Sequence, residues 1–346
     1  MADEPVLRVQ TLVETGLSNV PSSYIQPPIN RPNSSPNPPN STNVPIIDLS
    51  NFDPNHLKHA CIHWGAFQIT NHGFPIRLLD EMRNLGMSFF EECTMEEKLK
   101  YGCDGKVAAS EGYGSRMLVR DDSVLDWRDY FDHHTLPVSR RNPSKWPEFS
   151  TNYRGVVVEY SDQMNVLAMK LLGMISESLG LPTSSVEDAV GEVYQNITIS
   201  YYPTCPQPKL TLGLQAHSDF GAITLLIQDD VGGLQVLKDG EWLTAHPVSD
   251  AIVVILADQV EIITNGQYKS AEHRAITNAH RARLSVATFH DPAKSKKIFP
   301  TEKLINKKNP ARYKEVTYGD YVSAWYTKGP EGKRNVDALL LQQQDP

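Results

Sequence analysis

The sequence predicts a mainly β fold with α-helices, in which a helical N-terminal half packs on an antiparallel β core, either a barrel or a sandwich. Up to residue 180, apolar residues recur at the spacing of amphipathic helices. From about residue 196 the apolar period changes to two, and turn sequences such as KDGE and TNGQ separate short runs. The 346 residues show no internal repeat, and we expect the two halves to form one functional unit.

Composition and charge exclude several classes of protein. The net charge of −8 disfavours a broad nucleic-acid surface and an anionic-membrane surface. No run of 18 apolar residues occurs, and the N-terminus MADEPVLRVQ lacks an apolar stretch, so we expect neither a membrane span nor a secretory signal. Four scattered cysteines without a C-x-x-C pair indicate reduced thiols. We therefore expect a cytoplasmic monomer with no nucleic-acid or membrane partner.

The first 190 residues are expected to hold most of the helices. A short helix around VQTLVETGL precedes a connector at 27–45, whose Pro, Asn and Ser content indicates an extended chain that is sensitive to proteolysis. The aromatic and charged segment at 106–147 has no regular period and is predicted to be irregular. The other predicted elements of this half are strands at 46–50 and 66–70, a turn at 71–73, and helices at 55–65, 76–93 and 151–180.

The second half is expected to consist of strands joined by hairpins, with a helix in YGDYVSAWYTKG near the end. The strand-like runs are ITISYYP, AITLLIQD, GLQVLKDGEWLTA, AIVVILADQVEIITNG and RLSVATFH. We therefore divide the chain into an N-terminal helix with its connector (1–44), a helical region (45–190) and a β core with a C-terminal lid helix (191–346).

One stretch of the β core carries the pattern of a metal site. LQAHSDFGAIT places His217 and Asp219 two residues apart, where both side chains lie on one face of a strand. A third candidate is His273 in YKSAEHRAIT. Two histidines and one carboxylate form a facial triad, which occupies one face of an octahedral iron(II) and leaves three positions open. A single His-x-Asp also arises by chance among polar strand residues, so the pair alone does not establish a metal site.

A basic motif follows the distal histidine. Arg283 and Ser285 lie ten and twelve residues beyond His273, in the apolar frame of HRARLSVATF. On an inward-facing strand Arg283 points toward the metal, and its guanidinium fork matches a carboxylate. Ser285 shares the face of Arg283 and can donate to the same group. The two residues predict a cosubstrate that carries a carboxylate and also chelates the metal.

Together these motifs resemble the plant branch of the 2-oxoglutarate- and iron(II)-dependent dioxygenases, over roughly residues 44–340. WGAFQITNHG, SYYPTCPQP, His-x-Asp, YKSAEHR and Arg-x-Ser follow in the family's order. The resemblance implies a double-stranded β-helix (jelly-roll) core buttressed by N-terminal helices, with ascorbate as the reductant. It implies that a small metabolite is hydroxylated or desaturated by O₂ while 2-oxoglutarate becomes succinate and CO₂. The residues implied for iron(II) are His217, Asp219 and His273, and those for 2-oxoglutarate are Arg283, Ser285 and Tyr202.

Two positions refine this resemblance. The family usually has asparagine where this chain has Ser200, so a contact of Ser200 with the cosubstrate would keep a hydroxyl but lose an amide. Asp219 is retained, whereas related halogenases give up this carboxylate for halide. Halogenation is therefore disfavoured.

The predicted substrate-binding residues come from the irregular segment, the strands and the C-terminal helix. Their aromatic side chains indicate a flat or ring-bearing substrate, although core packing is the alternative for each of them. Tyr130 and Tyr326 are expected to face inward from a lid, with Phe289 at the floor. The full set is Tyr113, Tyr130, Asp132, His134, Thr198, Phe289, Asp291 and Tyr326.

The identity of the substrate stays open among flavonoid, coumarin and alkaloid classes. The N-terminal sequence resembles the jasmonate hydroxylases of the family, which makes a jasmonate-type hormone hydroxylase an alternative. Those enzymes hold their acidic substrate with arginines, whereas the matching positions here are Thr198, Val322 and Tyr326. This difference weakens the jasmonate alternative.

Three further functions fit part of the pattern. A related non-haem iron oxidase that uses another reductant shares the triad and even Arg-x-Ser, and succinate formation would separate it. A non-catalytic binding protein has no need for an intact triad together with Arg283. A zinc hydrolase can use two histidines and an aspartate, but it offers no role for Arg283.

Overall fold

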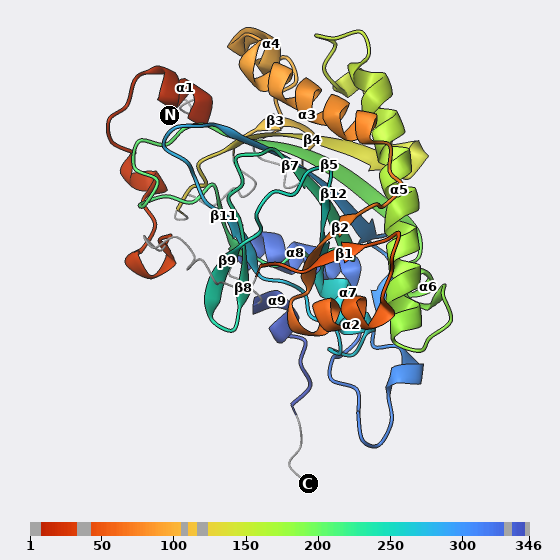
Figure 1. Cartoon of the computed structure of the whole chain (residues 1–346). Coiled ribbons are helices and arrows are strands. Elements are labelled where there is room, and N and C mark those ends of the chain that lie inside the picture. Colours follow the sequence, from red (N-terminus) through yellow and green to blue (C-terminus); the bar gives the residue numbers. More distant parts are fainter. Residues whose placement is uncertain (1–7, 33–42, 105–109, 116–123, 329–333, 343–346) are drawn as a thin grey trace.

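The molecule is built from two facing β-sheets and a layer of helices on one side (Figure 1). The structure is a computed structural model and describes residues 8–32, 43–104, 110–115, 124–328 and 334–342. Apart from the parallel pair at one edge of the large sheet, neighbouring strands run antiparallel. The predicted mainly β fold, a jelly-roll core buttressed by helices, is confirmed.

In both sheets, strands that are far apart in the sequence lie side by side. Among the described residues, the small sheet has four strands in the spatial order β6 (Leu214–His217), β11 (His273–Ala275), β8 (Leu234–Lys238) and β9 (Glu241–Thr244). A short pair, β13 (Lys297–Ile298) and β14 (Val316–Thr317), stands apart. Within the described ranges, the large sheet has eight strands in the order β1 (Ile46–Asp48), β2 (Ala66–Thr70), β10 (Ile252–Leu256), β7 (Ile223–Gln228), β12 (Arg283–Pro292), β5 (Val193–Tyr202), β4 (Asp129–Leu136) and β3 (Gly112–Gly114).

The helices lie mainly in the N-terminal half, as the sequence predicts. Within the described ranges, no helix is long and apolar enough to cross a membrane. The helices are α1 (Val9–Glu14), α2 (Pro54–His63), α3 (Ile76–Glu91), α4 (Met95–Leu99), α5 (Tyr153–Ser178), α6 (Ser185–Val190), α7 (Asp258–Ile263), α8 (Tyr318–Lys328) and α9 (Arg334–Asp337), with short 3-10 turns at Ser22–Tyr24, Pro28–Asn30, Val138–Arg140, Pro143–Lys145 and Glu302–Leu304.

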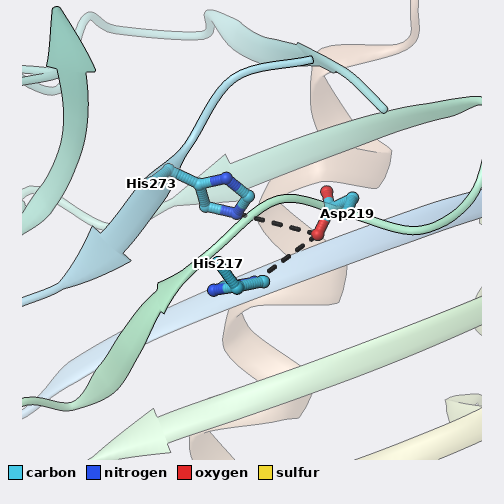
Figure 2. A group of neighbouring side chains, drawn as sticks. All are labelled: His217, Asp219 and His273. Carbon is cyan, nitrogen blue, oxygen red and sulfur yellow. Dashed lines mark ion pairs between the residues drawn. The ribbon is translucent and has the colours of Figure 1, made fainter. Parts of the chain in front are cut away.

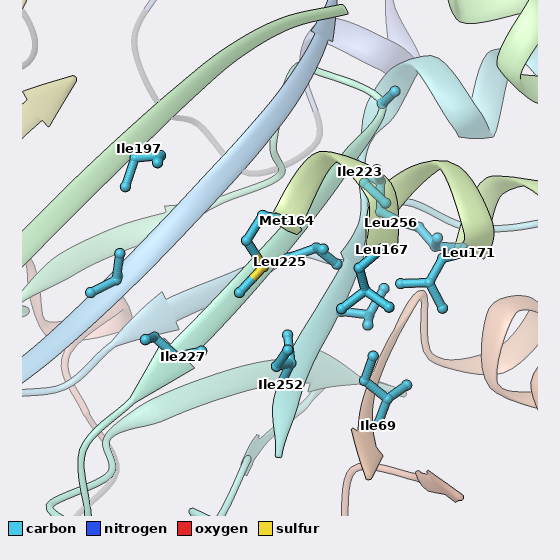
Figure 3. Packing of buried hydrophobic residues seen from close by; sticks show 14 of the residues in the cluster. Ile69, Met164, Leu167, Leu171, Ile197, Ile223, Leu225, Ile227, Ile252 and Leu256 are labelled. Carbon is cyan, nitrogen blue, oxygen red and sulfur yellow. The ribbon is translucent and has the colours of Figure 1, made fainter. Parts of the chain in front are cut away.

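The main hydrophobic core joins α5 to the outer face of the large sheet (Figure 3). Met164, Leu167 and Leu171 are three and four residues apart, so they lie on one side of α5. Their side chains are buried in one cluster with Ile223 and Leu225 of β7. This packing holds the large sheet against a rigid helical layer, which leaves its inner face free to carry a site.

A second apolar cluster fills part of the space between the two sheets. Leu226 and Val253 from the large sheet are buried with Val236 and Leu243 from the small sheet. Apolar members from the large sheet come from β2, β7 and β10, and Ala287 of β12 packs at their edge. The inner face of β12, β5 and β4 carries polar residues instead, and the functional site lies there.

Part of the segment predicted to be irregular is in fact a strand. DYFDHHTL forms β4, which pairs antiparallel with β5. Phe131 and His133 are fully buried, and His133 Nε2 lies 2.9 Å from the Tyr153 hydroxyl of α5, so these residues face the helices. Asp132 and His134 alternate with them and face inward. Polar residues on both faces conceal the period of two that a half-buried strand normally shows.

The predicted strand run AIVVILADQVEIITNG is a strand only as far as Leu256, and α7 follows. The backbone N–H groups of Asp258 and Gln259 donate to the carbonyls of Asp219 and Gly221, both at 2.9 Å. These tertiary hydrogen bonds, made to the loop that carries a predicted metal ligand, end the strand despite the β-branched residues that favour it.

The N-terminal segment agrees with the prediction in part. Helix α1 is present, but the described part of the connector, which the sequence predicts to be extended, contains a 3-10 turn at Pro28–Asn30. Residues 33–42 lie outside the described residues. The extended conformation and proteolytic sensitivity of the connector therefore stay predictions.

Candidate active site

The three predicted metal ligands meet at the edge of the small sheet (Figure 2). His217 is the last residue of β6, and Asp219 follows two residues later. His273 is the first residue of β11 and pairs directly with His217 in the antiparallel register. Because paired residues on adjacent strands share a face, the two imidazole rings lie side by side, with centres 4.3 Å apart.

The hydrogen bonds of both histidines direct the same ring nitrogen to one point. The Nδ1 atoms of His217 and His273 lie 2.8 and 3.0 Å from the carbonyl oxygens of Gln215 and Ala271. Each Nδ1 must carry the proton to make this bond, so each Nε2 presents a lone pair. The Nε2 atoms lie 3.5 and 3.7 Å from the same carboxylate oxygen, Oδ1 of Asp219. Two imidazoles and one carboxylate in this arrangement fit a divalent metal such as iron(II) or zinc.

The surroundings keep Asp219 and His273 in the forms that bind metals. Thr224 Oγ1 donates to Asp219 Oδ2 at 2.6 Å, which leaves Oδ1 for a metal. Burial alone would raise the pKa of Asp219, but His273, His217 and the Thr224 bond lower it to about 2. Burial, reinforced by His217, lowers the pKa of His273 to about 4. At neutral pH the carboxylate is therefore charged and the His273 ring is neutral.

The predicted anion-binding residues lie on the inner face of β12 and β5. Arg283 pairs with Tyr202, and Ser285 pairs with Ser200. Arg283 is buried and donates to Ser285 Oγ at 3.2 Å and to Gln228 Oε1 at 3.3 Å, and its Cζ atom lies 4.8 Å from the centre of the Tyr202 ring. Within the described part of the chain, the buried Nε of Arg283 has no hydrogen-bond partner. A carboxylate ligand would satisfy this donor.

Most of the predicted substrate residues share this inner face. Direct pairing sets Tyr130 beside Ser200, Asp132 beside Thr198, and Phe289 in line with His134 through β5. The ring of Tyr326, from α8, lies 6.0 Å from the ring of Phe220, the residue that follows Asp219. The predicted residues that the structure brings to this side are Tyr130, Asp132, His134, Thr198, Phe289, Asp291 and Tyr326.

Tyr113 is an exception, and its predicted role in substrate binding is wrong. Tyr113 pairs with Phe131, so it lies on the outer face of the large sheet. Its ring centre is 5.9 and 6.1 Å from those of Phe89 and Phe90 in α3. Tyr113 is a core residue, and the error follows from missing the strand period of β3 and β4.

Three polar residues of the site escape the sequence motifs. Thr224 donates to the carboxylate of Asp219, a predicted metal ligand, and Gln228 accepts a hydrogen bond from Arg283. Arg128 is buried just before β4 and donates to Ser200 Oγ at 3.0 Å. The segment DWRDYF carries a signal for Arg128, because Arg128 and Tyr130 are two residues apart and share a face once β4 is identified as a strand.

The inner face also carries a carboxyl group whose charge is costly. Burial raises the pKa of Asp132 to about 7, although Thr198 Oγ1 donates to its Oδ1 at 2.7 Å. The folded-state pKa lies above the ordinary value of 3.8, so the native state binds more protons and loses stability as pH rises from about 4 to about 7. We expect Asp132→Asn to unfold at a higher temperature than wild type at pH 8, with the difference vanishing near pH 4.

Thermal unfolding of both proteins between pH 4 and pH 8 checks this expectation. Asp320→Asn is a matched control, because Asp320 is an exposed acid on α8. A difference between Asp132→Asn and wild type that stays constant over this range would contradict the burial of a charged Asp132.

Known proteins with this sequence and fold agree with the geometry. Residues 194–292 match the model of the 2OG-Fe(II) oxygenase superfamily, and residues 44–149 match that of the non-haem dioxygenase in morphine synthesis N-terminal. Jasmonate-induced oxygenase 4 of Arabidopsis thaliana is 40% identical over 98% of each chain, and thebaine 6-O-demethylase of Papaver somniferum is 36% identical over 96% of this chain and 95% of the relative. The solved structure of JOX2 in complex with 2OG, Fe and JA matches with a TM-score of 0.90 at 38% identity, covering 98% of each chain. The chain therefore belongs to the 2OG-Fe(II) oxygenase superfamily and is a 2-oxoglutarate- and iron(II)-dependent oxygenase of its plant branch.

Proposed function

We propose that this oxygenase hydroxylates or desaturates a small, ring-bearing plant metabolite, with His217, Asp219 and His273 as its iron(II) ligands. The observation that carries the proposal is that both Nε2 atoms face one oxygen of Asp219. When bound there, iron(II) supplies O₂ activation, which a protein side chain cannot perform. The protein's own contribution is to orient the reactants and to exclude water, and no general base is required.

The cosubstrate site follows from the position of Arg283. Its guanidinium, with Ser285, Tyr202 and Ser200 around it, would hold the distal carboxylate of 2-oxoglutarate. The keto acid end of the cosubstrate would then point along the inner face toward Asp219. Ascorbate would serve as the reductant that keeps the iron in the ferrous state.

The organic substrate would bind on the inner face of β4, β5 and β12, beneath α8. Trp325 and Tyr326 of α8 lie over the ligand loop, with ring centres 5.1 and 6.0 Å from that of Phe220. This aromatic cover would exclude water during oxidation. The other predicted lid segment is 112–134, of which residues 116–123 lie outside the described residues.

Removing the aromatic ring of Tyr130 or Tyr326 is expected to uncouple the conversion of 2-oxoglutarate to succinate from the oxidation of the organic substrate. Tyr130→Ala and Tyr326→Ala should each weaken binding of the organic substrate about tenfold, through lost apolar contact. The affinity for 2-oxoglutarate should change little in Tyr326→Ala, because the Tyr326 ring packs near Phe220. Tyr130 lies in the row of Ser200 and Ser285, so Tyr130→Ala tests substrate binding and coupling only. Succinate should then form in excess of the oxidised product, and the ratio of the two measured by mass spectrometry checks this. Tyr326→Phe, which keeps the ring, is the control, and unchanged affinity and coupling in both alanine variants would place the substrate elsewhere.

A jasmonate-type substrate is a second candidate, because jasmonate-induced oxygenases are among the relatives and the JOX2 complex contains JA. The residues of this chain argue against it. Thr198, where the jasmonate hydroxylases are expected to have an arginine, donates to the carboxylate of Asp132. Asp291 lies on the same face, and its pKa is raised to about 7 by burial and by Asp219. Above about pH 7, where Asp132 and Asp291 are charged, an acidic substrate would meet repulsion on this face, whereas a neutral or hydrogen-bond-donating metabolite of the flavonoid, coumarin or alkaloid classes would not.

A metabolite screen tests the proposed function. Purified protein with iron(II), ascorbate and 2-oxoglutarate should convert a ring-bearing compound to a product that gains one oxygen atom or loses two hydrogen atoms. Succinate should appear in step with that product. An oxidase that uses another reductant would not form succinate.

We also propose that the enzyme works as a cytoplasmic monomer in which the helical region (45–190) and the β core (191–346) form one unit. Size-exclusion chromatography with light scattering should give the mass of a single chain.

A further inference from the structure

Ser200 belongs to one of two neighbouring arginine–serine pairs on the inner face of the large sheet. Its Oγ accepts a hydrogen bond from Nη1 of Arg128 at 3.0 Å. On the neighbouring strand, Nη1 of Arg283 donates to Ser285 Oγ at 3.2 Å. Ser200 and Ser285 are direct register partners of β5 and β12. Two arginine–serine pairs therefore lie side by side, and only the Arg283 pair has a role so far.

Arg128 is held firmly in this position. It lies immediately before β4, two residues from Tyr130, which pairs with Ser200. Its side chain is 3% exposed, its Cζ atom lies 5.4 Å from the centre of the Tyr130 ring, and its backbone N–H donates to the Asp126 carbonyl at 3.0 Å. Arg128 also makes at least one further interaction. A buried guanidinium so fixed acts as a permanent positive charge beside Ser200.

Tyr202 reports the combined effect of the two pairs. It is fully enclosed, and burial alone would raise the pKa of its hydroxyl. The pKa is lowered instead, because Arg283, Arg128 and the hydroxyls of Ser285 and Ser200 all stabilise the phenolate. Two guanidiniums and two hydroxyls therefore make the space around the Tyr202 hydroxyl more favourable for negative charge than a single guanidinium would.

We propose that Arg128 is a positioning residue for the distal carboxylate of 2-oxoglutarate, and that it acts through Ser200. This proposal rests on the assignment of Arg283 and Tyr202 to the cosubstrate. Since Ser200 Oγ accepts from Arg128, its own O–H is left to donate, and Ser200 lies directly beside Ser285, which Arg283 contacts. The Arg128–Ser200 pair thereby supplies the donor that an asparagine amide would otherwise provide at this position, and adds a second positive charge.

The test compares two ligands that differ only at the distal end, 2-oxoglutarate and 2-oxopentanoate, which has a methyl group in place of that carboxylate. Their dissociation constants are measured by calorimetry on Mn(II)-loaded protein, so the readout does not depend on turnover. Arg128→Gln is expected to raise the Kd of 2-oxoglutarate about tenfold or more and to leave that of 2-oxopentanoate within about twofold. Because Arg128 acts through Ser200, Ser200→Ala should raise the Kd of 2-oxoglutarate to a similar extent, and the double variant should be no weaker than either single variant.

Arg140→Gln is the matched control, because Arg140 also lies near this sheet but donates to Asn196. Circular dichroism and Tm values identify a variant that has merely lost its fold. Arg128→Lys, which keeps the charge without the fork, is the second variant in that case. Its Kd for 2-oxoglutarate should lie between those of wild type and Arg128→Gln. Equal weakening of both ligands, additive effects of the two substitutions, or unchanged 2-oxoglutarate affinity would overturn the role of Arg128. Failure of wild-type protein to bind 2-oxoglutarate would instead contradict the cosubstrate assignment on which the role depends.

Discussion

Replacing Asp219 with alanine is expected to abolish turnover, lowering it more than about 100-fold. Changing even the groups that hold metal ligands in place lowers metal affinity or activity about 10–100-fold. The variant removes the one oxygen toward which both imidazole Nε2 atoms point. The fold should survive, because the Asp219 side chain bonds Thr224 and otherwise faces the two histidines. Succinate release by purified, iron-supplied protein and metal content after dialysis are the measurements.

His217→Ala and His273→Ala should give the same result, since each removes one of the two imidazole donors. Asp320→Ala, an exposed acid on α8, should behave as wild type. Normal succinate release by Asp219→Ala with unfolding as cooperative as that of wild type would contradict the assignment of the three ligands. Activity that depends on zinc and is insensitive to iron would instead support the hydrolase alternative.

Replacing Arg283 with alanine is expected to raise the requirement for 2-oxoglutarate by a factor on the order of 30 or more. Losing one partner of a buried, charge-assisted pair costs roughly 2–5 kcal/mol. Arg283→Lys should recover only part of the affinity, because an ammonium cannot form the two parallel bonds of a guanidinium. The measurement is the Kd of 2-oxoglutarate in the absence of O₂, together with the concentration that gives half-maximal succinate release.

A matched control lies two residues before Arg283, just outside the start of β12. Arg281 is exposed and forms a surface ion pair with Asp230 at 2.6 Å, and such pairs contribute little. Arg281→Ala should therefore leave the 2-oxoglutarate affinity unchanged. Unchanged affinity in Arg283→Ala as well would show that the cosubstrate carboxylate binds elsewhere.

The parts of the site that could be predicted from sequence are those in which spacing along one strand equals proximity in space. His217 and Asp219 are two residues apart, and so are Arg283 and Ser285, so a period of two is enough to set each pair on one face. The fold class follows in the same way from the change of apolar period near residue 196. The pairing of His273 with His217 requires the sheet register, which only the resemblance to a family supplied in advance.

The parts that could not be predicted depend on contacts between distant strands. Arg128 belongs to the site only because β4 lies next to β5, and β4 was hidden by polar residues on both of its faces. The same omission misplaced Tyr113, which packs against α3. The helix α7 replaces a predicted strand because two of its N–H groups bond to the metal-ligand loop, a tertiary contact that local propensity cannot reveal.

The central claim is that O₂ oxidises 2-oxoglutarate at the His217–Asp219–His273 site, and isotope labelling tests it most directly. Purified, iron-loaded protein is supplied with 2-oxoglutarate and a converted substrate under ¹⁸O₂, and succinate is analysed by mass spectrometry. We predict that succinate carries one ¹⁸O atom and that its amount falls to background in Asp219→Ala. Succinate without label, or no succinate above the Asp219→Ala background while the substrate is oxidised, would contradict the account.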